Sequence, residues 1–322
     1  FLAQTLLKQG IKVYGTVRRG GSPKTDRLKE FKILDKVIFI PMEITEFSNV
    51  INLLSDIRPD HIYNLSAQSF VVDSFRHPIM TNQVNYVGVL NILESVRILR
   101  LDAKIFQPST SEMYGDQSDI SVNELTAFNP SNPYGLSKLA AYRAINIYRN
   151  TYGLRASSAI LFNHESPLRG EEFITRKITL GLANIISGKK KKIKVGNLYA
   201  KRDWGYAGDY VEAMWKMLQN KSPKDYVIGT GKNYSVKNFI DVATKILNLK
   251  TKWRGKGINE KLINLENNKT IIEIDKKFFR PTEVDTLKGD FSKAAKELNW
   301  KPKTNFTELV EMMIKADIDR KL

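Results

Sequence analysis

The sequence contains no cysteine among its 322 residues. It can therefore form no disulfide bond, and it has no thiolate for nucleophilic catalysis or for a Cys-based metal site. The three histidines, His61, His77 and His164, are well separated in the chain, so we expect no metal site. No apolar run reaches the roughly 18 residues that a transmembrane helix needs, and we expect no membrane partner. No signal-peptide pattern is present, and these features favour a cytoplasmic, reducing compartment.

Acidic residues are also scarce relative to basic ones, because 51 lysines and arginines against 34 aspartates and glutamates give a net charge of +17. Such a charge suits either a nucleic-acid partner or an anionic small molecule such as a nucleotide diphosphate. The lysines are scattered, however, and the dense run Lys189 to Lys192 with Lys194 is typical of a solvated turn. We therefore expect no nucleic-acid partner.

Short apolar segments alternate with helical patterns through the first half of the chain. Strands are expected at 11–17, 36–40, 61–65, 103–106 and 155–162, with helices at about 46–57 and 84–99 and a longer one that carries Tyr134. This alternation predicts an α/β fold with a doubly wound parallel sheet. Beyond Asn163 the pattern becomes a mixture that predicts a smaller mixed α/β lobe. We place a cofactor-binding domain at 1–163 and a substrate-binding lobe at 164–322, with a helix near 209–219 and a strand at 226–228 (within about 205–230) returning to the first domain.

The first residues, Phe1 to Gln9, have a helix-like pattern that Gly10 closes. A dinucleotide-binding fold needs a strand and a Gly-rich turn before such a helix, and we expect both to lie upstream of the printed sequence. Arg18 and Arg19 follow the next expected strand, where an acidic residue usually binds the ribose of NAD and arginine suits the 2′-phosphate of NADP. We interpret the two arginines as NADP contacts, although a surface turn explains them as well.

Tyr134 and Lys138 lie four residues apart at the start of an amphipathic helix, and therefore on one helical face. A neighbouring ammonium group favours phenolate, so we expect it to lower the pKa of Tyr134. Such a tyrosine can accept a proton from a sugar hydroxyl while a nicotinamide accepts the hydride. Thr110 and Glu112, expected in a loop past a strand end, could hold the sugar and move a proton. Chance spacing and turn capping explain the same residues.

Longer motifs add specificity to these candidates, and they run nearly from end to end of the chain. The motifs are I-Y-N-L-S-A-Q-S (62–69), S-T-S-E-M-Y-G (109–115), N-P-Y-G-L-S-K-L (132–139), L-F-N-H-E-S-P-L-R-G (161–170), F-I-T-R-K-I-T (173–179), G-N-L-Y-A-K-R-D-W-G (196–205) and F-R-P-T-E-V-D (279–285). Together they resemble the GDP-mannose 4,6-dehydratases, which are extended short-chain dehydrogenase/reductases with a Rossmann-type fold. The Tyr/Lys pair is common to that superfamily, whereas N-H-E-S-P and K-R-D-W-G are far more specific.

The resemblance implies dehydration of GDP-mannose to GDP-4-keto-6-deoxymannose by internal hydride transfer through NADP. The residues that match the family's catalytic positions are Thr110, Glu112, Tyr134 and Lys138. Those that match its cofactor contacts, or lie beside them, are Arg18, Arg19, Glu43, Ile44, Leu65, Ser66, Ala67, Gln68, Ser69, Tyr134, Lys138, His164 and Arg169. Those that match its GDP-sugar contacts are Ser69, Asn163, Lys177, Arg202, Arg280 and Glu283. The Arg18–Arg19 loop resembles one that reaches a neighbouring subunit's cofactor, which implies a homodimer or homotetramer.

The sequence departs from the family pattern at a few positions: Leu168 stands where an arginine is usual, and Glu43 replaces aspartate. Three alternatives to the main interpretation remain. The first is the same reaction on another GDP-sugar, such as GDP-manno-heptose. The second is a GDP-4-keto-6-deoxy-sugar reductase on the same fold, which would not need Glu112. The third is a non-catalytic NADP-binding or nucleic-acid-binding protein, favoured only by the charge.

Overall fold

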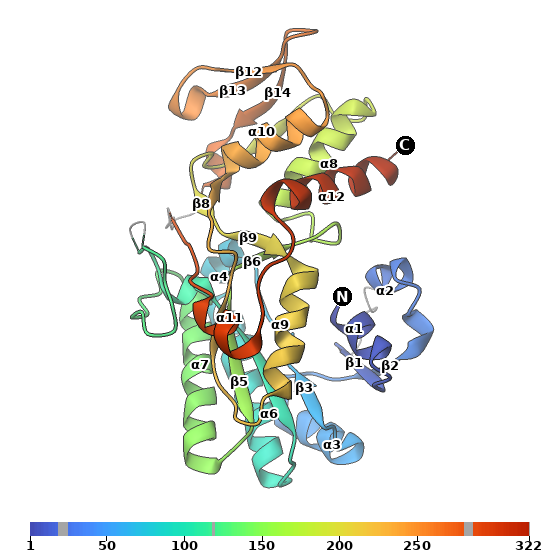
Figure 1. Cartoon of the computed structure of the whole chain (residues 1–322), viewed down its shortest axis with the longest axis vertical. Helices are drawn as coiled ribbons and strands as arrows, with labels where there is room; N and C mark the ends of the chain where they lie inside the picture. Colours follow the sequence, from blue (N-terminus) through green and yellow to red (C-terminus); the bar gives the residue numbers. More distant parts are fainter. Residues whose placement is uncertain (19–24, 118–119, 280–285, 322) are drawn as a thin grey trace.

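The computed structural model describes residues 1–18, 25–117, 120–279 and 286–321, and it has the predicted α/β architecture with a parallel sheet (Figure 1). The main sheet contains four parallel strands in the order β10 (Tyr226–Ile228), β5 (Ala156–Leu161), β4 (Lys104–Thr110) and β3 (His61–Tyr63). A separate two-stranded parallel sheet is formed by β1 (Val13–Val17) and β2 (Val37–Pro41). β10 pairs with β5 although a long stretch of sequence separates them.

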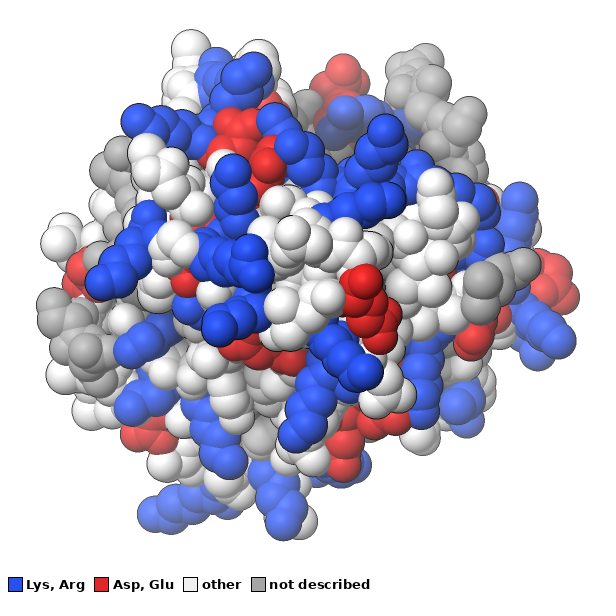
Figure 2. All heavy atoms as spheres, turned by 90° about the horizontal axis from the view of Figure 1, so that it is seen from above, with Lys and Arg blue, Asp and Glu red and all other residues white. Residues whose placement is uncertain are grey.

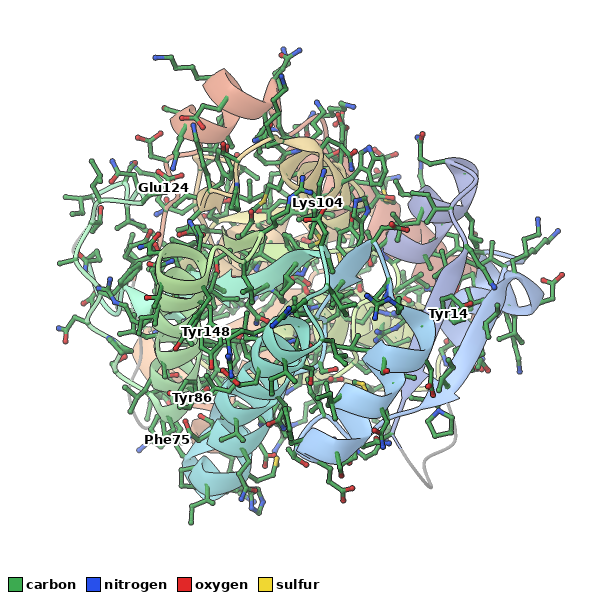
Figure 3. All side chains as sticks on the ribbon, turned by 90° about the horizontal axis from the view of Figure 1, so that it is seen from below. Tyr14, Phe75, Tyr86, Lys104, Glu124 and Tyr148 are labelled. Atoms are coloured by element: carbon green, nitrogen blue, oxygen red, sulfur yellow. The ribbon has the colours of Figure 1, made fainter. Side chains whose placement is uncertain are left out.

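Helices cover both faces of the main sheet. Since side chains alternate between the two faces along each strand, neighbouring residues of a strand pack against different helix layers. Ile105 of β4 packs with the helices of one layer, which are α3 (Phe47–Ile57), α6 (Gly88–Ile98) and α7 (Pro133–Tyr152). Its neighbour Phe106 packs with the other layer, formed by α9 (Ala207–Gln219), α11 (Ser292–Leu298) and the start of α1 (Leu2–Lys8). In Figure 3, Tyr14 of β1 and Tyr148 of α7 lie toward opposite sides of the molecule.

The lobe lies beyond the carboxyl ends of the main strands, at the top of Figure 1. Its helices α8 (Ile174–Ile186), α10 (Val236–Ile246) and α12 (Phe306–Asp319) share an apolar core with a second sheet. That sheet has the order β12 (Thr251–Arg254), β13 (Lys261–Asn264), β14 (Lys269–Ile274) and β7 (Ile193–Val195). The proposed division of domains at residue 163 stays a prediction.

The lysine run that begins at Lys189 lies in the turn between α8 and β7, as expected. Lys192 and Lys194 form ion pairs with Glu273 of β14, and Lys194 also pairs with Asp275. Figure 2 shows lysine and arginine side chains spread over the lobe's outer face with acidic side chains between them. Within the described residues, no helix is both long enough and apolar enough to cross a membrane.

The remaining elements are short and connect these layers. They are α2 (Asp26–Glu30), α4 (Val71–Arg76), α5 (Pro78–Asn82), β6 (Asn163–Glu165), β8 (Lys201–Arg202), β9 (Trp204–Tyr206) and β11 (Tyr234–Ser235), with 3₁₀ turns η1 (Leu34–Lys36), η3 (Ser111–Met113), η4 (Gly257–Asn259) and η5 (Lys276–Phe278), and one π-helical turn, η2 (Gln83–Val87).

Two expected strands end elsewhere in the structure, and one expected helix differs in its first turn. The strand expected at 61–65 ends at Tyr63. The strand expected at 103–106 continues to Thr110, because β4 pairs with β5 as far as Thr110 with Leu161. The polar residues at the end of β4 show no alternation of apolar side chains, so the sequence gives no strand signal there. This part of the strand is recognised only by its pairing with β5. The helix expected at 84–99 begins with the π-helical turn η2 before α6. Such turns are frequent at functional sites.

Candidate active site

A cleft of about 850 Å³ lies between the carboxyl ends of the main strands and the lobe. Ligands of doubly wound sheets bind at this edge, where the loops after neighbouring strands meet. The cleft is lined by the ends of β4 and β5, the start of α7, the loop 165–173 before α8, and lobe residues between 196 and 204. All four predicted catalytic side chains line it.

The predicted catalytic residues come from three consecutive elements. Thr110 is the last residue of β4, Glu112 lies in η3 directly after it, and Tyr134 and Lys138 occupy the first turns of α7. The Thr110 hydroxyl accepts a hydrogen bond from the Glu112 backbone N–H at 3.3 Å, and its side chain also hydrogen-bonds Tyr134. Thr110 therefore links the phenol to the turn that carries the carboxylate.

The expectation that Lys138 lowers the pKa of Tyr134 is wrong for this structure. Burial raises the pKa of Tyr134 to about 12, and the groups that oppose this shift are the Thr110 hydrogen bond and the positive charge of Arg169. Burial lowers the pKa of Lys138 from its ordinary value of 10.5 to about 8. The Lys138 Nζ donates a hydrogen bond to the Pro108 carbonyl oxygen at 3.0 Å. Helical spacing predicted the shared face, but the cost of burying charge dominates both groups.

Lys138→Met is expected to raise the free energy of unfolding by about 1–3 kcal/mol at pH 7, because it removes a buried ammonium group. The folded pKa of Lys138, about 8, lies below the ordinary 10.5, so the unfolded chain binds more protons between these values. The wild type therefore gains stability as pH rises through this window, and the advantage of the variant is largest below pH 8.

Urea unfolding of both proteins at pH 7 and at about pH 10 measures this difference. Pro108 keeps a donor in the variant, since the Gln107 side-chain amide also bonds its carbonyl oxygen at 3.2 Å. Lys245→Met, at an exposed position of α10, is the matched control and should change stability by less than about 0.5 kcal/mol at either pH. A Lys138→Met protein less stable than the wild type at pH 7 would contradict the argument.

The segment Leu65 to Ser69, a predicted cofactor contact, follows β3 along one wall of the cleft. Leu65, Ala67 and Ser69 line the cleft. The backbone N–H groups of Ser66 and Gln68 instead donate to the side-chain oxygens of Asn64 and Asn85. The side chain of Asn85, in η2, accepts from the Gln68 backbone N–H at 2.9 Å and donates to the Gln68 carbonyl oxygen at 3.0 Å. The π-helical turn thus fixes this wall.

His164 and Arg169, the other predicted cofactor contacts near the sheet, both line the cleft. The His164 ring lies 5.2 Å from the Tyr210 ring, and its Nδ1 is 3.1 Å from the Phe162 carbonyl oxygen. Burial, followed by the charge of Arg169, lowers the pKa of His164 and keeps the imidazole neutral. The Arg169 guanidinium lies 3.5 Å over the Phe173 ring and pairs with buried Glu165 at 3.1 Å.

Three predicted substrate contacts, Asn163, Lys177 and Arg202, also line the cleft. Lys177 lies on α8 with its Nζ 3.2 Å from the centre of the Phe278 ring, and burial, aided by Lys190, lowers its pKa to about 8. Arg202 is buried and donates to the Lys201 carbonyl oxygen at 2.9 Å. These cations approach the cleft from the lobe side.

Other predicted contacts are not gathered at the cleft. Arg18 is exposed, and its Nε lies 4.0 Å from the Glu43 Oε2. Ile44 is buried in the core between α3 and α6. None of these three lines the cleft. The predicted contacts Arg19, Arg280 and Glu283 lie outside the described residues.

Sequence reasoning missed several residues that hold the site. Asn85 is one, and Asn132, whose amide donates to the Glu112 carboxylate at 2.9 Å, is another. A third group is an ion pair beneath the loop 166–170, in which Arg176 of α8 donates to the carbonyl oxygens of Pro167 and Arg169 and pairs with Asp317 of α12. Only the position of Asn132, directly before a proline at a helix start, left a signal in the sequence, as a helix N-cap.

Known proteins resemble the chain in sequence and in structure. The family sequence model described as GDP-mannose 4,6 dehydratase matches residues 1–313. A Drosophila melanogaster protein named GDP-mannose 4,6 dehydratase is 43% identical over 329 residues, which cover 99% of this chain and 83% of the relative. The solved UDP-glucuronic acid 4-epimerase of Bacillus cereus, in complex with UDP-glucuronic acid and NAD, superposes with a TM-score of 0.81 at 22% identity, covering 99% and 95% of the two chains. RMD from Pseudomonas aeruginosa, complexed with NADPH, gives 0.76 at 20% identity and covers 99% and 96%.

Proposed function

This chain belongs to the GDP-mannose 4,6-dehydratase family, and from that premise we propose that Thr110, Glu112, Tyr134 and Lys138 form its catalytic site. The protein is an enzyme, a hydro-lyase that converts GDP-mannose to GDP-4-keto-6-deoxymannose. The observation that supports the residue assignment is that Thr110 hydrogen-bonds both the Tyr134 side chain and the Glu112 backbone N–H, while the phenol, the hydroxyl and the carboxyl group all line one cleft. A reductase on this fold would have no use for the carboxyl group.

The residues of the cleft fit the nicotinamide and ribose half of a dinucleotide. The buried Ser109 hydroxyl lines the cleft and has no hydrogen-bond partner among the residues described. Tyr134 and Lys138 lie beside it, and Ser69 and His164 line the same cleft, so ribose hydroxyls and a carboxamide would find both donors and acceptors. A nicotinamide held by these residues would supply the hydride acceptor for C4 of the sugar and the hydride donor for C6, which would leave the reaction redox-neutral.

We propose NADP as the cofactor in preference to NAD. Arg18 follows β1 directly and is exposed, as a residue that pairs with a 2′-phosphate would be. Dissociation constants for NADP and NAD, measured by intrinsic fluorescence quenching, test the choice. Equal affinities would contradict it.

The chain's own residues manage the protons of the reaction. Tyr134 accepts the O4 proton in its phenolate form, which the Thr110 hydrogen bond and the Arg169 charge favour against the opposing effect of burial. The C4 ketone acidifies the C5–H bond, and Glu112 removes that proton. The C6–O bond then breaks, and Glu112 returns its proton to the departing hydroxide, which leaves as water. The proton held by Tyr134 is finally transferred to C5, so protons and electrons balance.

Incubation of the enzyme with GDP-mannose and catalytic NADP⁺ tests the function directly. Mass spectrometry should find a product lighter by one water, with no net reduction of the cofactor. If GDP-manno-heptose is dehydrated and GDP-mannose is not, the choice of sugar is wrong. If neither reacts, the proposed site does not perform this chemistry.

We further propose a homodimer or homotetramer. Leu136 and Ile147 lie about three turns apart on α7, and therefore on one face, where their side chains are 60% and 56% exposed. Exposed apolar side chains aligned in this way favour association with a second copy. Sedimentation velocity measures the assembly, and a monomer at micromolar concentration would contradict the proposal. The cytoplasmic location stays a prediction.

A further inference from the structure

Asn132 is the N-cap of α7, the helix that carries Tyr134 and Lys138. Its side-chain Oδ1 accepts a hydrogen bond from the Gly135 backbone N–H at 2.8 Å. Pro133, the next residue, has no N–H of its own to be satisfied, as is common at the first position of a helix. The cap fixes the orientation of the amide, because a flipped amide would set its NH₂ group against the Gly135 N–H.

The fixed amide directs its Nδ2 toward the Glu112 carboxylate. The Nδ2 donates to the Glu112 Oε2 at 2.9 Å, and the two side chains are only 7% and 8% exposed. A Cβ at position 135 would lie 2.7 Å from the Glu112 carbonyl oxygen, so glycine at this position lets the first turn of α7 approach η3 closely. The helix start and the carboxyl group are therefore held in direct contact.

We propose that Asn132 is a positioning residue for Glu112, which it holds in the orientation for proton transfer at C5 and C6. This inference rests on the proposed function. One amide performs two tasks: its oxygen caps the helix that carries Tyr134, and its nitrogen anchors the carboxylate. The arrangement couples the positions of the two proton-transfer groups, because a shift of the helix start would displace both. A hydrogen bond to a charged acceptor is among the stronger ones in proteins.

The two tasks can be separated by substitution. Serine is as good an N-cap as asparagine, so Asn132→Ser keeps the cap and removes the donor to Glu112. Aspartate also caps, but Asn132→Asp sets a second carboxylate against the first. Asn146→Ser is the matched control, since the Asn146 amide on the same helix donates to the Asp225 carboxylate at 2.9 Å, away from the cleft.

We expect Asn132→Ser to lower kcat about 10- to 100-fold with KM for GDP-mannose within about twofold, because a misplaced proton-transfer group slows the chemistry and leaves binding unchanged. Elimination should slow more than oxidation at C4. Acid quench and mass spectrometry should therefore detect a sugar nucleotide that lacks two hydrogens but keeps its C6 oxygen. Asn132→Ser should keep the melting temperature of the wild type within a few degrees, because the cap is retained. Asn132→Asp should lose more activity than Asn132→Ser and should also melt at a lower temperature, because two carboxylates would then share one buried site. Asn146→Ser should keep the wild-type kcat and accumulate no such ketone.

A wild-type enzyme with no activity on GDP-mannose would refute the proposed function. An active wild type with Asn132→Ser turnover within twofold would overturn the positioning role alone. A loss of turnover accompanied by a lower melting temperature and no ketone would also overturn it, since capping would then explain the effect.

Discussion

Glu112→Gln is expected to abolish the loss of water from GDP-mannose while binding of NADP stays intact. An amide cannot remove the C5 proton, and general acid–base groups contribute about 10²- to 10⁴-fold to rate. Glutamine has the size of glutamate, and its side-chain oxygen can still accept the Asn132 hydrogen bond seen at 2.9 Å. The fold around Thr110 and Tyr134 should therefore be preserved. Steady-state turnover by mass spectrometry, with NADP titration by fluorescence, measures both quantities.

The control for this variant is Glu171→Gln, which removes the same charge from an exposed position in the loop 165–173. Its turnover should equal that of the wild type. Oxidation at C4 should continue in Glu112→Gln, because Tyr134 is untouched, and the undehydrated 4-keto sugar should be detectable after acid quench. Dehydratase activity above about one tenth of the wild-type value would contradict the role given to Glu112.

Asp317→Ala is expected to lower the free energy of unfolding by about 3–5 kcal/mol, although Asp317 lies outside the cleft. Its carboxylate is fully buried and pairs with Arg176 at 2.8 Å and with Arg320 at 3.2 Å. It also accepts a hydrogen bond from the Thr179 hydroxyl at 2.7 Å. Removing the carboxylate leaves the Arg176 side chain, which is 10% exposed, without its counter-ion.

The same change should weaken cofactor binding. Arg176 donates to the carbonyl oxygens of Pro167 and Arg169 at 2.7 and 3.1 Å, and Arg320 donates to Pro167 at 2.9 Å. The two arginines therefore hold the loop that carries Arg169 into the cleft. Loosening that loop should raise the dissociation constant for NADP several-fold under conditions where the variant is still folded.

Urea unfolding with fluorescence detection measures the stability of this variant, and NADP titration at low urea measures its affinity. The matched control is Asp319→Ala, two residues further along α12 at an exposed position, which should change stability by less than about 0.5 kcal/mol. The free energy of unfolding of Asp317→Asn should lie between those of the two alanine variants, since asparagine keeps a hydrogen-bond acceptor without the charge. If Asp317→Ala and Asp319→Ala unfold at the same urea concentration, the buried pair contributes nothing measurable.

Local patterns predicted the elements better than they predicted electrostatics. The alternation of apolar segments and helices gave the parallel sheet and its helices, with β10 (Tyr226–Ile228) at its predicted bounds. The four-residue spacing predicted that Tyr134 and Lys138 share one face of the helix, and both side chains line the cleft. The same spacing gave the wrong direction for the pKa of Tyr134, because that pKa is dominated by burial, which no local pattern reports.

Among the predicted contacts, those beside an end of a main-sheet strand were brought together, since the carboxyl ends of parallel strands share one edge of the sheet. Thr110 follows this rule through β4, and His164 lies three residues past Leu161, the last paired residue of β5. Arg18 and Glu43 follow strands of the separate β1–β2 sheet, and they do not line the cleft. Sequence gave no reason to connect Asp317, at the far end of the chain, with the loop that carries Arg169. That contact depends on how α12 packs against α8.

The sequence by itself determined the fold class, the succession of strands and helices in the first half of the chain, and the residue types proposed to carry the chemistry, because these depend on periodicity and on short motifs. Tertiary structure alone decided the burial of those groups and their contacts with one another. It extended β4 to Thr110, left Tyr134 half-buried and Lys138 fully buried, placed the Asn132 amide on Glu112, and anchored the Arg169 loop to α12. The physical reason is that burial and the direction of a hydrogen bond depend on which distant segments are in contact. Packing of the whole chain determines those contacts.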